Sequence, residues 1–262
     1  MYIILNGKPT HTAALSALSL RNADEVVILN GFQITDDRRL QAGDNVVLIQ
    51  KGVMPSVDEM EAMMAARHTP GFHSRLKAAR VAIAGLGGLG SHVAVILARM
   101  GVGSLFLVDF DVVEPSNLNR QHYTLSHLAK PKTEALKSQL ADINPFIEVK
   151  TRDIKITSEN AAAVFRGYSI VVEAFDNPAS KADLAEALLG TGDITVVAAS
   201  GLAGFESANQ IRTQRRLANL YLVGDMETAA EEGVGLMAPR VAVCAGHQAN
   251  MVIRLLMGLD CE

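Results

Sequence analysis

A glycine-rich turn follows a short apolar segment near the middle of the chain. Residues Val81 to Ala84 predict a buried strand, and the sequence Gly85-Leu-Gly-Gly-Leu-Gly90 comes directly after it. This is the G-x-G-x-x-G spacing, in which backbone amides at a helix N-terminus can bind a phosphate group. We expect Gly85 to form the tight turn, Gly87 to let the backbone approach the phosphate, and Gly90 to allow close packing of the helix.

An acidic residue ends the next predicted strand. Leu105 to Val108 is apolar and leads into Asp109, nineteen residues after Gly90. In dinucleotide-binding folds a carboxylate at this place binds the ribose hydroxyls. The glycines and this aspartate predict a Rossmann-type nucleotide site. They fit an NAD-dependent enzyme as well as other nucleotide-binding enzymes.

The residues after Asp109 separate these possibilities. Asp111 is followed by the sequence Ser116-Asn-Leu-Asn-Arg-Gln121, and Lys130-Pro-Lys132 begins the next predicted helix. A bound dinucleotide needs few cations near its phosphates, whereas an ATP that must release pyrophosphate needs several. Arg120 and Lys132 therefore indicate nucleotidyl transfer.

Together, the motifs G-x-G-G-L-G, D-x-D, S-N-L-N-R-Q and P-K resemble the ThiF/MoeB/HesA family of ubiquitin-activating-enzyme-like adenylyltransferases, over roughly residues 75–257. Members of this family use ATP and Mg²⁺ to activate the C-terminal carboxylate of a small ubiquitin-like sulfur carrier. The resemblance implies an α/β fold with a Rossmann-like nucleotide-binding sheet and helices on both faces. It also implies a homodimer, because the family completes each nucleotide site across a two-fold interface.

The resemblance also assigns the site residues. Arg120 would stabilise the α-phosphate, Lys132 the departing pyrophosphate, and Asp176 would bind Mg²⁺ just past the predicted strand Ile170 to Ala174. The alternative for Asp176 is a cap of the helix that starts near Pro178. The implied nucleotide-binding residues are Gly85, Gly87, Gly88, Gly90, Asp109, Asp111, Asn117, Arg120, Gln121, Lys132 and Asn177.

Two further assignments have open alternatives. In the family an arginine ahead of the Rossmann unit reaches the γ-phosphate in the partner subunit; Arg67 is the nearest match, and Arg75 is its rival. Either arginine is also compatible with a solvated surface role. Asp111 is either a second carboxylate near the metal or the acceptor of a hydrogen bond that fixes its loop.

The N-terminal segment predicts a second, smaller domain. Short strands around a helical patch at Leu15 to Leu20 give the order strand, strand, helix, strand, strand of a β-grasp domain. This segment resembles the ThiS family of sulfur carriers. A working carrier ends in a free Gly-Gly, whereas this segment continues through Lys51-Gly-Val-Met-Pro55. We therefore expect a carrier-like domain that has lost its reactive end and is not adenylated.

The predicted organisation is a ThiS-like domain at residues 1–54, a helical linker at 55–79 and an adenylation domain at 80–262. Within the last we expect an antiparallel strand over Ser207 to Arg212, a mobile loop over Glu227 to Leu236 and a helix from Ala238 to about Met257.

Composition excludes several classes of protein and site. Of the 262 residues 49% are hydrophobic, and the net charge of −4 gives no electrostatic footprint for nucleic acid. No segment has the pattern of a signal peptide or a membrane span, so we expect a cytoplasmic protein without membrane contact. Cys244 and Cys261 are too few for a four-thiolate zinc site, so no zinc is expected, and persulfide chemistry would belong to another protein such as a sulfurtransferase.

We therefore expect an ATP-dependent adenylyltransferase that activates a separate ThiS-like carrier in thiamine biosynthesis. No general base is needed, because a terminal carboxyl group with a pKa of about 3.5 is already ionised near neutral pH. The alternatives are the activation of a molybdopterin-type carrier, an amidating relative that adenylates another acyl group, an NAD-binding Rossmann oxidoreductase, and a carrier-docking protein without enzymatic activity.

Overall fold

The computed structural model describes residues 1–22 and 24–260, which form two compact units. The first unit spans Met1–Arg75, and the second begins at Leu76. Cys261, one of the two cysteines in the sequence, lies outside the described residues. Among the residues that are described, no helix has both the length and the apolar composition needed to cross a bilayer.

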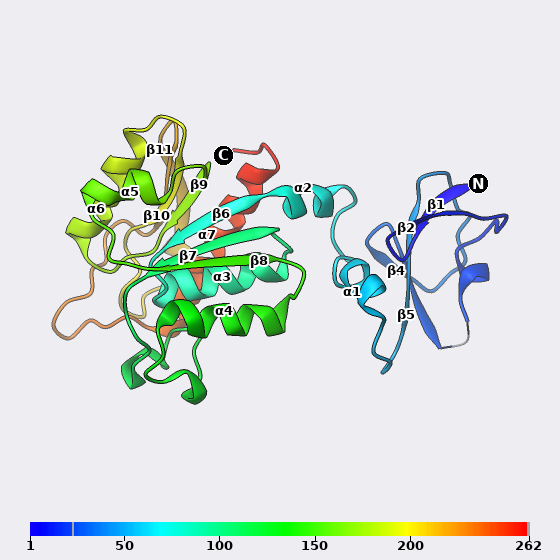
Figure 1. Ribbon diagram of the computed structural model, residues 1–262, viewed down its shortest axis with the longest axis horizontal. Helices are drawn as coiled ribbons and strands as arrows, with labels where there is room; N and C mark the ends of the chain where they lie inside the picture. Colours follow the sequence, from blue (N-terminus) through cyan, green and yellow to red (C-terminus); the bar gives the residue numbers. More distant parts are fainter. Residues whose placement is uncertain (23, 261–262) are drawn as a thin grey trace. The chain divides into compact units, whose positions relative to one another are not determined.

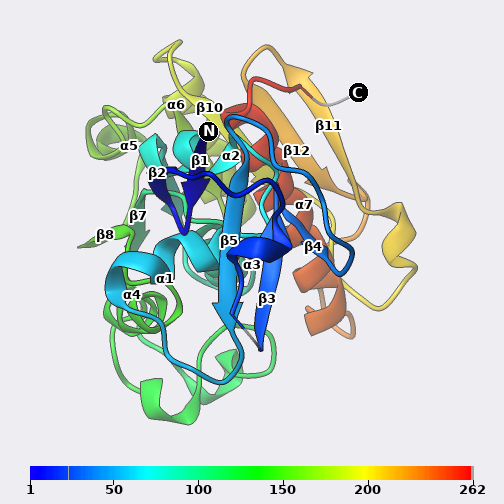
Figure 2. The ribbon, with the colours of Figure 1, turned by 90° about the vertical axis from the view of Figure 1, so that its right-hand side faces the viewer.

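The first unit is built on a five-stranded sheet with the order β2-β1-β5-β3-β4. β1 and β5 are parallel, and the other neighbours are antiparallel. Figure 2 shows β5 between β1 and β3. This arrangement confirms the predicted β-grasp domain. Its strands are β1 (Tyr2–Leu5), β2 (Lys8–His11), β3 (Glu25–Leu29), β4 (Phe32–Ile34) and β5 (Asn45–Gln50).

The helical patch predicted over Leu15 to Leu20 is wrong in extent. Only a short 3₁₀ helix, η1 (Leu18–Leu20), forms there. Ser16 pairs with Arg39 in an isolated antiparallel bridge, and the amide of Ala17 donates to the carbonyl of Arg38 at 2.8 Å. These bonds to a distant segment replace the intrahelical bonds of a longer helix.

Both faces of the first sheet are covered. Successive residues of a strand point to opposite faces, so Val46 and Val47 of β5 belong to two separate apolar clusters. The cluster that contains Val47 also contains Ala66, and Met63 packs against it. The helix α1 (Val57–Met64) and the residues after it therefore cover this second face.

The turn between β1 and β2 packs directly against α1. Asn6 donates from Nδ2 to Oε1 of Glu59 at 3.3 Å. Gly7 has a φ of 80°, and a Cβ placed on it would lie 2.8 Å from the Cβ of Ala62. Only glycine fits here without displacing the helix.

The second unit is a seven-stranded sheet in the order β11-β12-β10-β9-β6-β7-β8, with helices on both faces, which confirms the predicted fold class (Figure 1). All neighbours are parallel except β11 and β12. The strands are β6 (Arg80–Ala84), β7 (Ser104–Asp109), β8 (Glu148–Asp153), β9 (Ile170–Glu173), β10 (Thr195–Ala199), β11 (Arg212–Leu217) and β12 (Leu220–Gly224).

Two groups of helices enclose this sheet. α3 contacts α4 and α7, whereas α5 contacts α6 on the other side (Figure 1). The remaining helices of the chain are α2 (Phe72–Ala78), α3 (Gly88–Arg99), η2 (Pro115–Asn117), η3 (Leu125–His127), α4 (Lys132–Ile143), α5 (Ser158–Val164), α6 (Pro178–Leu189), η4 (Ala208–Gln210) and α7 (Ala238–Leu256). The predicted helix from Ala238 is confirmed by α7.

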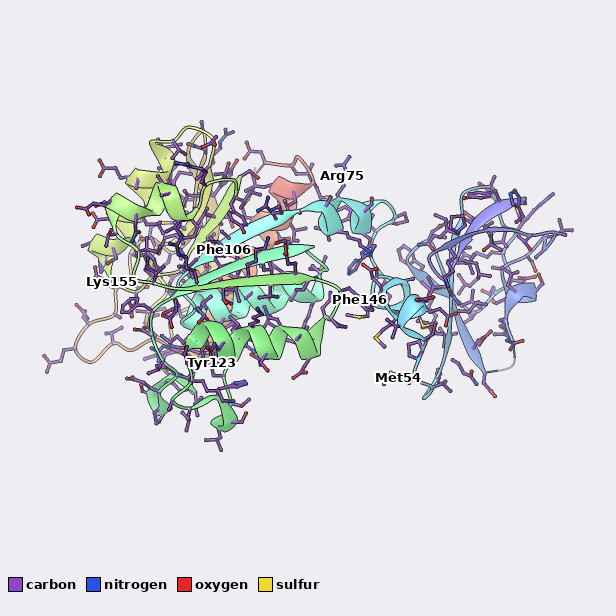
Figure 3. The ribbon with its side chains drawn as sticks, viewed as in Figure 1. Met54, Arg75, Phe106, Tyr123, Phe146 and Lys155 are labelled. Carbon is purple, nitrogen blue, oxygen red and sulfur yellow. The ribbon has the colours of Figure 1, made fainter. Side chains whose placement is uncertain are left out.

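The core of the second unit joins these layers. Phe106 of β7, labelled in Figure 3, stacks on Tyr168 with ring centroids 5.2 Å apart. On the opposite side of the sheet, fully buried Gln248 of α7 donates from Nε2 to the carbonyl of Glu173 at 3.0 Å and to that of Val197 at 3.1 Å. A single side chain thus bonds the last helix to β9 and β10.

The antiparallel strand predicted over Ser207 to Arg212 is misplaced. Ala208–Gln210 forms the 3₁₀ helix η4, and the antiparallel strand is β11, which begins at Arg212. β11 lies at the edge of the sheet, where charged side chains remain solvated and discourage pairing with another chain. Its sequence is accordingly polar except for Leu217, so it lacks the apolar run that identifies the central strands.

We predict that Gly7→Ala loosens α1, because the added methyl group both strains a left-handed backbone and collides with Ala62. Amide exchange over residues 57–64 in the full chain should become about tenfold faster, which corresponds to ~1.4 kcal/mol. Gly43→Ala is the matched control, since Gly43 has a φ of 91° and open space around its Cβ position. Equal exchange in the two variants would contradict the direct packing of α1.

Candidate active site

The carboxyl ends of the central strands open into one cavity of about 860 Å³ in the second unit. Open α/β sheets bind ligands at this edge. The cavity brings together every predicted nucleotide-binding residue except Gly90, and Asp176 also lines it. The residues concerned are Gly85, Gly87, Gly88, Asp109, Asp111, Asn117, Arg120, Gln121, Lys132 and Asn177.

The glycines shape the turn between β6 and α3. Gly85 has a φ of 90°, and a Cβ on it would lie 2.8 Å from the carbonyl oxygen of Ala174. A Cβ on Gly90 would lie only 1.8 Å from the carbonyl oxygen of Gly85. Gly90 thus lets α3 pack closely under the turn, while Gly87 and Gly88 present the start of the helix to the cavity.

The carboxylate of Asp109 binds the backbone of this turn. Its Oδ2 accepts from the amide of Leu86 at 2.6 Å, and its Oδ1 accepts from the amides of Phe110 and Asp111 at 2.7 and 2.8 Å. Burial raises the pKa of Asp109, although nearby Lys132 opposes this shift. A carboxylate has about four acceptor positions, so one remains for the predicted ribose contact.

Tyr123 is a residue that the sequence motifs did not indicate. Its side chain is labelled in Figure 3. The buried hydroxyl donates to the carbonyl oxygen of Leu86 at 2.8 Å, and burial raises the pKa of Tyr123. Leu86 is thus held through both backbone groups, by Asp109 on one side and Tyr123 on the other. Nothing in the spacing of Tyr123 from the glycines predicts this contact.

Lys132 is buried at the start of α4 and donates from Nζ to Oδ2 of Asp111 at 2.8 Å. This contact matches the alternative in which Asp111 fixes its loop. The ammonium group has three donors, so it can bind a ligand in the cavity while it keeps this bond. The ion pair holds the Lys132 ammonium group at the cavity wall, and the carboxylate of Asp111 partly compensates its positive charge.

Arg120 and Gln121 present buried polar atoms without partners among the described residues. Nη1 of Arg120 donates to Ser116 O at 3.1 Å and to Oδ1 of Asn119 at 2.9 Å, but Nε of Arg120 and Oε1 of Gln121 bind no described residue. Buried polar atoms normally have partners, so these two indicate a ligand or water at this wall.

Asn117 lines the same cavity and stabilises the loop that carries Arg120. Its Oδ1 accepts from the amide of Glu114 at 3.0 Å and so caps η2. The side chain therefore stabilises the loop, and its implied role in nucleotide binding stays a prediction.

At the end of β9, the neighbours Asp176 and Asn177 have different environments. Oδ1 of Asn177 accepts from the amide of Ser180 at 3.0 Å and caps α6, so Asn177 and not Asp176 is the helix cap. Asp176 is exposed to the cavity, and no described residue donates a hydrogen bond to its carboxylate. Its oxygens are available for a ligand.

An ion pair between a buried carboxylate and a partly exposed lysine holds the segment that carries Asp176. Glu173 is fully buried and accepts from the amide of Phe175 at 2.7 Å, and its Oε2 lies 2.8 Å from Nζ of Lys181. Lys181 also donates to the carbonyl of Phe175 at 2.8 Å and lines the cavity. The motifs did not indicate Lys181, although its place one helical turn after Asn177 could have done so.

A second cation that the motifs did not indicate is Lys155, labelled in Figure 3. Its Nζ lies 5.8 Å from the ring centroid of Phe110, within the range of a cation–π contact. Both residues line the cavity, and Phe110 is 54% exposed. This wall offers an apolar face with a positive charge beside it.

The remaining sequence assignments lie elsewhere. Arg67 and Arg75 belong to the first unit, where Nη2 of Arg67 donates to Oε1 of Gln33 at 2.8 Å. Cys244 is fully buried, and burial raises the pKa of its thiol to about 12, so the thiol is unreactive near neutral pH. Within the described part of the chain, no three His, Cys, Asp or Glu side chains are grouped to hold a metal ion.

Comparison with known proteins identifies the fold's relatives. A sequence model of the ThiF family matches residues 61–262. The chain belongs to the ThiF family. A model described as ThiS-like ubiquitin matches residues 1–52, which agrees with the β-grasp sheet of the first unit.

Among curated ThiF-family relatives, the chain is 32% identical over 193 residues to the adenylyltransferase and sulfurtransferase UBA4 of Saccharomyces cerevisiae, covering 71% of this chain and 43% of that protein. It is 37% identical over 108 residues to the probable adenylyltransferase/sulfurtransferase MoeZ of Mycobacterium tuberculosis, covering 41% of this chain and 28% of that protein. The chain thus spans less than half the length of these relatives.

Solved structures show the same fold. E. coli TcdA, a tRNA N6-threonylcarbamoyladenosine dehydratase determined in complex with ATP, matches with a TM-score of 0.70 and 23% identity over 79% of this chain and 98% of that chain. E. coli MccB, determined with succinimide, matches with a TM-score of 0.57 and 25% identity over 76% of this chain and 62% of that chain.

We predict that Tyr123→Phe destabilises the second unit, because it leaves the buried carbonyl of Leu86 without a donor. The free energy of unfolding should fall by about 1–3 kcal/mol in denaturant titrations. Tyr168→Phe is the control, since the Tyr168 ring packs on Phe106 in the core. If both substitutions cost the same, the Tyr123 hydroxyl does not stabilise the glycine turn.

Proposed function

We propose that the chain is an ATP-dependent adenylyltransferase that activates the terminal carboxylate of a separate ThiS-like sulfur carrier, in thiamine biosynthesis. One observation carries this proposal: a single cavity joins the glycine turn to Arg120, Lys132 and Asp176. Nucleotide binding alone does not need these three charges. The names of the relatives UBA4 and MoeZ, which contain adenylyltransferase, support the same reaction.

The residues of the cavity suit an in-line transfer. A carboxylate oxygen of the carrier attacks the α-phosphorus of ATP, and the bond from that phosphorus to the bridging oxygen of pyrophosphate breaks. The products are carrier-AMP and pyrophosphate. Negative charge grows on the departing group, so fixed donors near it lower the barrier. The α3 amides, Arg120 and Lys132 are such donors, and each is held by the protein before ATP binds.

Mg²⁺ fits the residues present. Protein sites for Mg²⁺ use one or two carboxylates and complete the shell with water and substrate phosphates. Asp176 offers a carboxylate at the cavity surface to which no described residue donates a hydrogen bond, and half-exposed Asp111 is a second carboxylate, shared with Lys132. Bound there, Mg²⁺ would neutralise charge on the pyrophosphate. Asp176 would be its principal protein ligand.

The structure of the first unit supports a separate carrier as the substrate. Gly52 lies in a turn with a φ of 73°, and α1 begins at Val57 and packs back on the same sheet. Met54, 82% exposed and labelled in Figure 3, lies between them. The segment that would be a carrier's reactive tail is thus an internal turn without a free carboxylate. The predicted homodimer, with Arg67 or Arg75 supplied across its interface, stays part of the proposal, and light scattering of the intact chain measures it.

The deciding experiment mixes the full chain with ATP, Mg²⁺ and candidate carriers that end in Gly-Gly, and looks by intact mass for an added AMP. We expect AMP on a ThiS-type carrier and none on residues 1–55 of the chain. AMP on a molybdopterin-type carrier would redirect the proposal to that pathway. NADH binding without any transfer would favour the oxidoreductase.

We predict that Asp176→Asn lowers carrier adenylation at least about a hundredfold while the fold is retained, because the metal loses its charged ligand. The sharper variant is Asp176→Asn with Asn177→Asp, which moves the carboxylate by one residue without changing the composition. This double variant should be as inactive as Asp176→Asn alone, because the carboxylate is no longer at the position that binds the metal. Near-normal pyrophosphate release by either variant would disprove the metal assignment.

We predict that Arg120→Ala and Lys132→Ala each lower turnover about a hundredfold or more, as loss of a fixed donor to developing charge does. Arg152→Ala is the control, since Arg152 is an exposed residue of β8 outside the cavity lining. Turnover is measured as pyrophosphate release at saturating ATP. Unchanged turnover in both site variants would remove them from the mechanism.

A further inference from the structure

The loop that carries Arg120 is bound to the first turns of α3 by side chains outside the sequence motifs. Ser91 and His92 lie in these turns, and His122 follows Arg120 by two residues. Ser91 is fully buried, and both histidines are partly buried. None of these three described residues lines the cavity, so the proposed reaction gives them no direct contact with ATP.

His92 bonds to the backbone of Arg120. Its Nε2 lies 3.1 Å from the carbonyl oxygen of Arg120. A carbonyl oxygen only accepts hydrogen bonds, so the ring donates from a protonated Nε2. Burial lowers the pKa of His92, which favours the neutral ring near neutral pH. The bond therefore needs no charge on the imidazole.

Ser91 binds the same loop and the glycine turn through one hydroxyl group. Its Oγ accepts from the amide of His122 at 3.1 Å and donates to the carbonyl of Gly87 at 2.7 Å. Gly87 lines the cavity. Two consecutive residues of α3 thus bind the backbone on both sides of Gln121, which is itself part of the cavity wall.

The rings of His92 and His122 pack against each other. Their centroids are 4.3 Å apart and their planes meet at 69°, which is an edge-to-face contact. Burial lowers the pKa of His122, and nearby His92 and Arg99 lower it further. Two neutral rings can pack closely without repulsion. This contact restricts rotation of the His92 ring and keeps its Nε2 directed at the carbonyl of Arg120.

The side chain of Arg120 is bound within its own loop. Nη1 donates to the carbonyl of Ser116 at 3.1 Å and to Oδ1 of Asn119 at 2.9 Å, while the buried Nε binds no described residue. The guanidinium group therefore moves with the loop. Asp109 fixes the start of this loop, and the bonds from α3 fix the end that carries Arg120.

We propose that His92 is a positioning residue for adenylyl transfer, which holds Arg120 in register with the amides of the glycine turn. This inference rests on the proposed function, in which both groups bind the α-phosphate. Their separation must then match the phosphate as its charge grows, because fixed donors act only when they are placed in advance. Loss of the His92 bond should therefore lower kcat more than the affinity for ATP.

The test compares His92→Ala with His92→Gln in the full chain, with ATP, Mg²⁺ and the Gly-Gly carrier that the wild-type protein adenylates. Glutamine can place an amide donor near the position of the ring Nε2, whereas alanine has no donor. His92→Ala should lower kcat about tenfold and leave the KM for ATP within about threefold, since small misplacements of a reacting group are costly. His92→Gln should keep kcat within about threefold of the wild type.

His127→Ala is the matched control. It also removes a hydrogen bond between a histidine ring and the backbone, because Nδ1 of His127 accepts from the amide of Thr124 at 3.1 Å, and His127 is outside the cavity lining. Its kcat should equal that of the wild type. An equal loss of kcat in His92→Ala and His92→Gln, or no loss in either, would overturn the positioning role.

Amide exchange over residues 120–123 gives a readout that does not depend on turnover. The amide of His122 donates to Ser91, so its exchange reports how firmly the loop is bound to α3. Exchange should be about tenfold faster in His92→Ala and close to wild type in His92→Gln. If the wild-type chain adenylates no carrier, the proposed function fails, and the exchange data alone decide whether His92 holds the loop. Unchanged exchange in His92→Ala would refute it.

Discussion

The geometry of the cavity depends on the carboxylate of Asp109. Three backbone amides converge on it, from Leu86 in the glycine turn and from Phe110 and Asp111 at the start of the next loop. A buried carboxylate is costly unless hydrogen bonds and nearby cations compensate the lost hydration, and these amides with Lys132 provide that compensation. Because the same group binds the ends of β6 and β7, the turn and the loop that carries Arg120 cannot move independently. The phosphate-binding amides and the cations are thus held in place by one interaction.

Some charged residues around the cavity form ion pairs with other described residues, and Asp176 does not. Lys181 with Glu173 holds the segment after β9, and Arg240 with Asp225 holds the segment after β12. Each of these pairs lies where a strand gives way to a loop, which is where the backbone lacks the support of sheet bonds. Asp176 is different, since its carboxylate has no described donor. These two pairs therefore support the shape of the cavity, whereas the carboxylate of Asp176 is available to a ligand.

The glycine turn, Asp109, Arg120, Lys132 and Asp176 could be predicted to lie together, because each follows a recognisable strand or motif and parallel strands bring their carboxyl ends to one edge. Contacts between distant segments could not be predicted from the sequence. Tyr123 bonds to a carbonyl 37 residues away, and Asp225 and Arg240 meet across a loop without apolar periodicity. β11 was misplaced for a related reason: its polar residues are explained by its position at the edge of the sheet, and strand order is a property of the whole fold. Spacing reports local geometry, whereas these features depend on tertiary packing.

The bonds of Gln248 bear on how the chain folds during synthesis. The sheet of the first unit pairs strands that are all made within the first 50 residues, so it can form early. In the second unit β6 lies between β7 and β9, and β9 is made about ninety residues later. Gln248 then bonds to β9 and β10 only when α7 emerges from the ribosome. Pairing of distant segments slows folding, so the nascent second unit exposes its central strands for longer than the first. We expect chaperones to bind the nascent second unit more than the β-grasp unit.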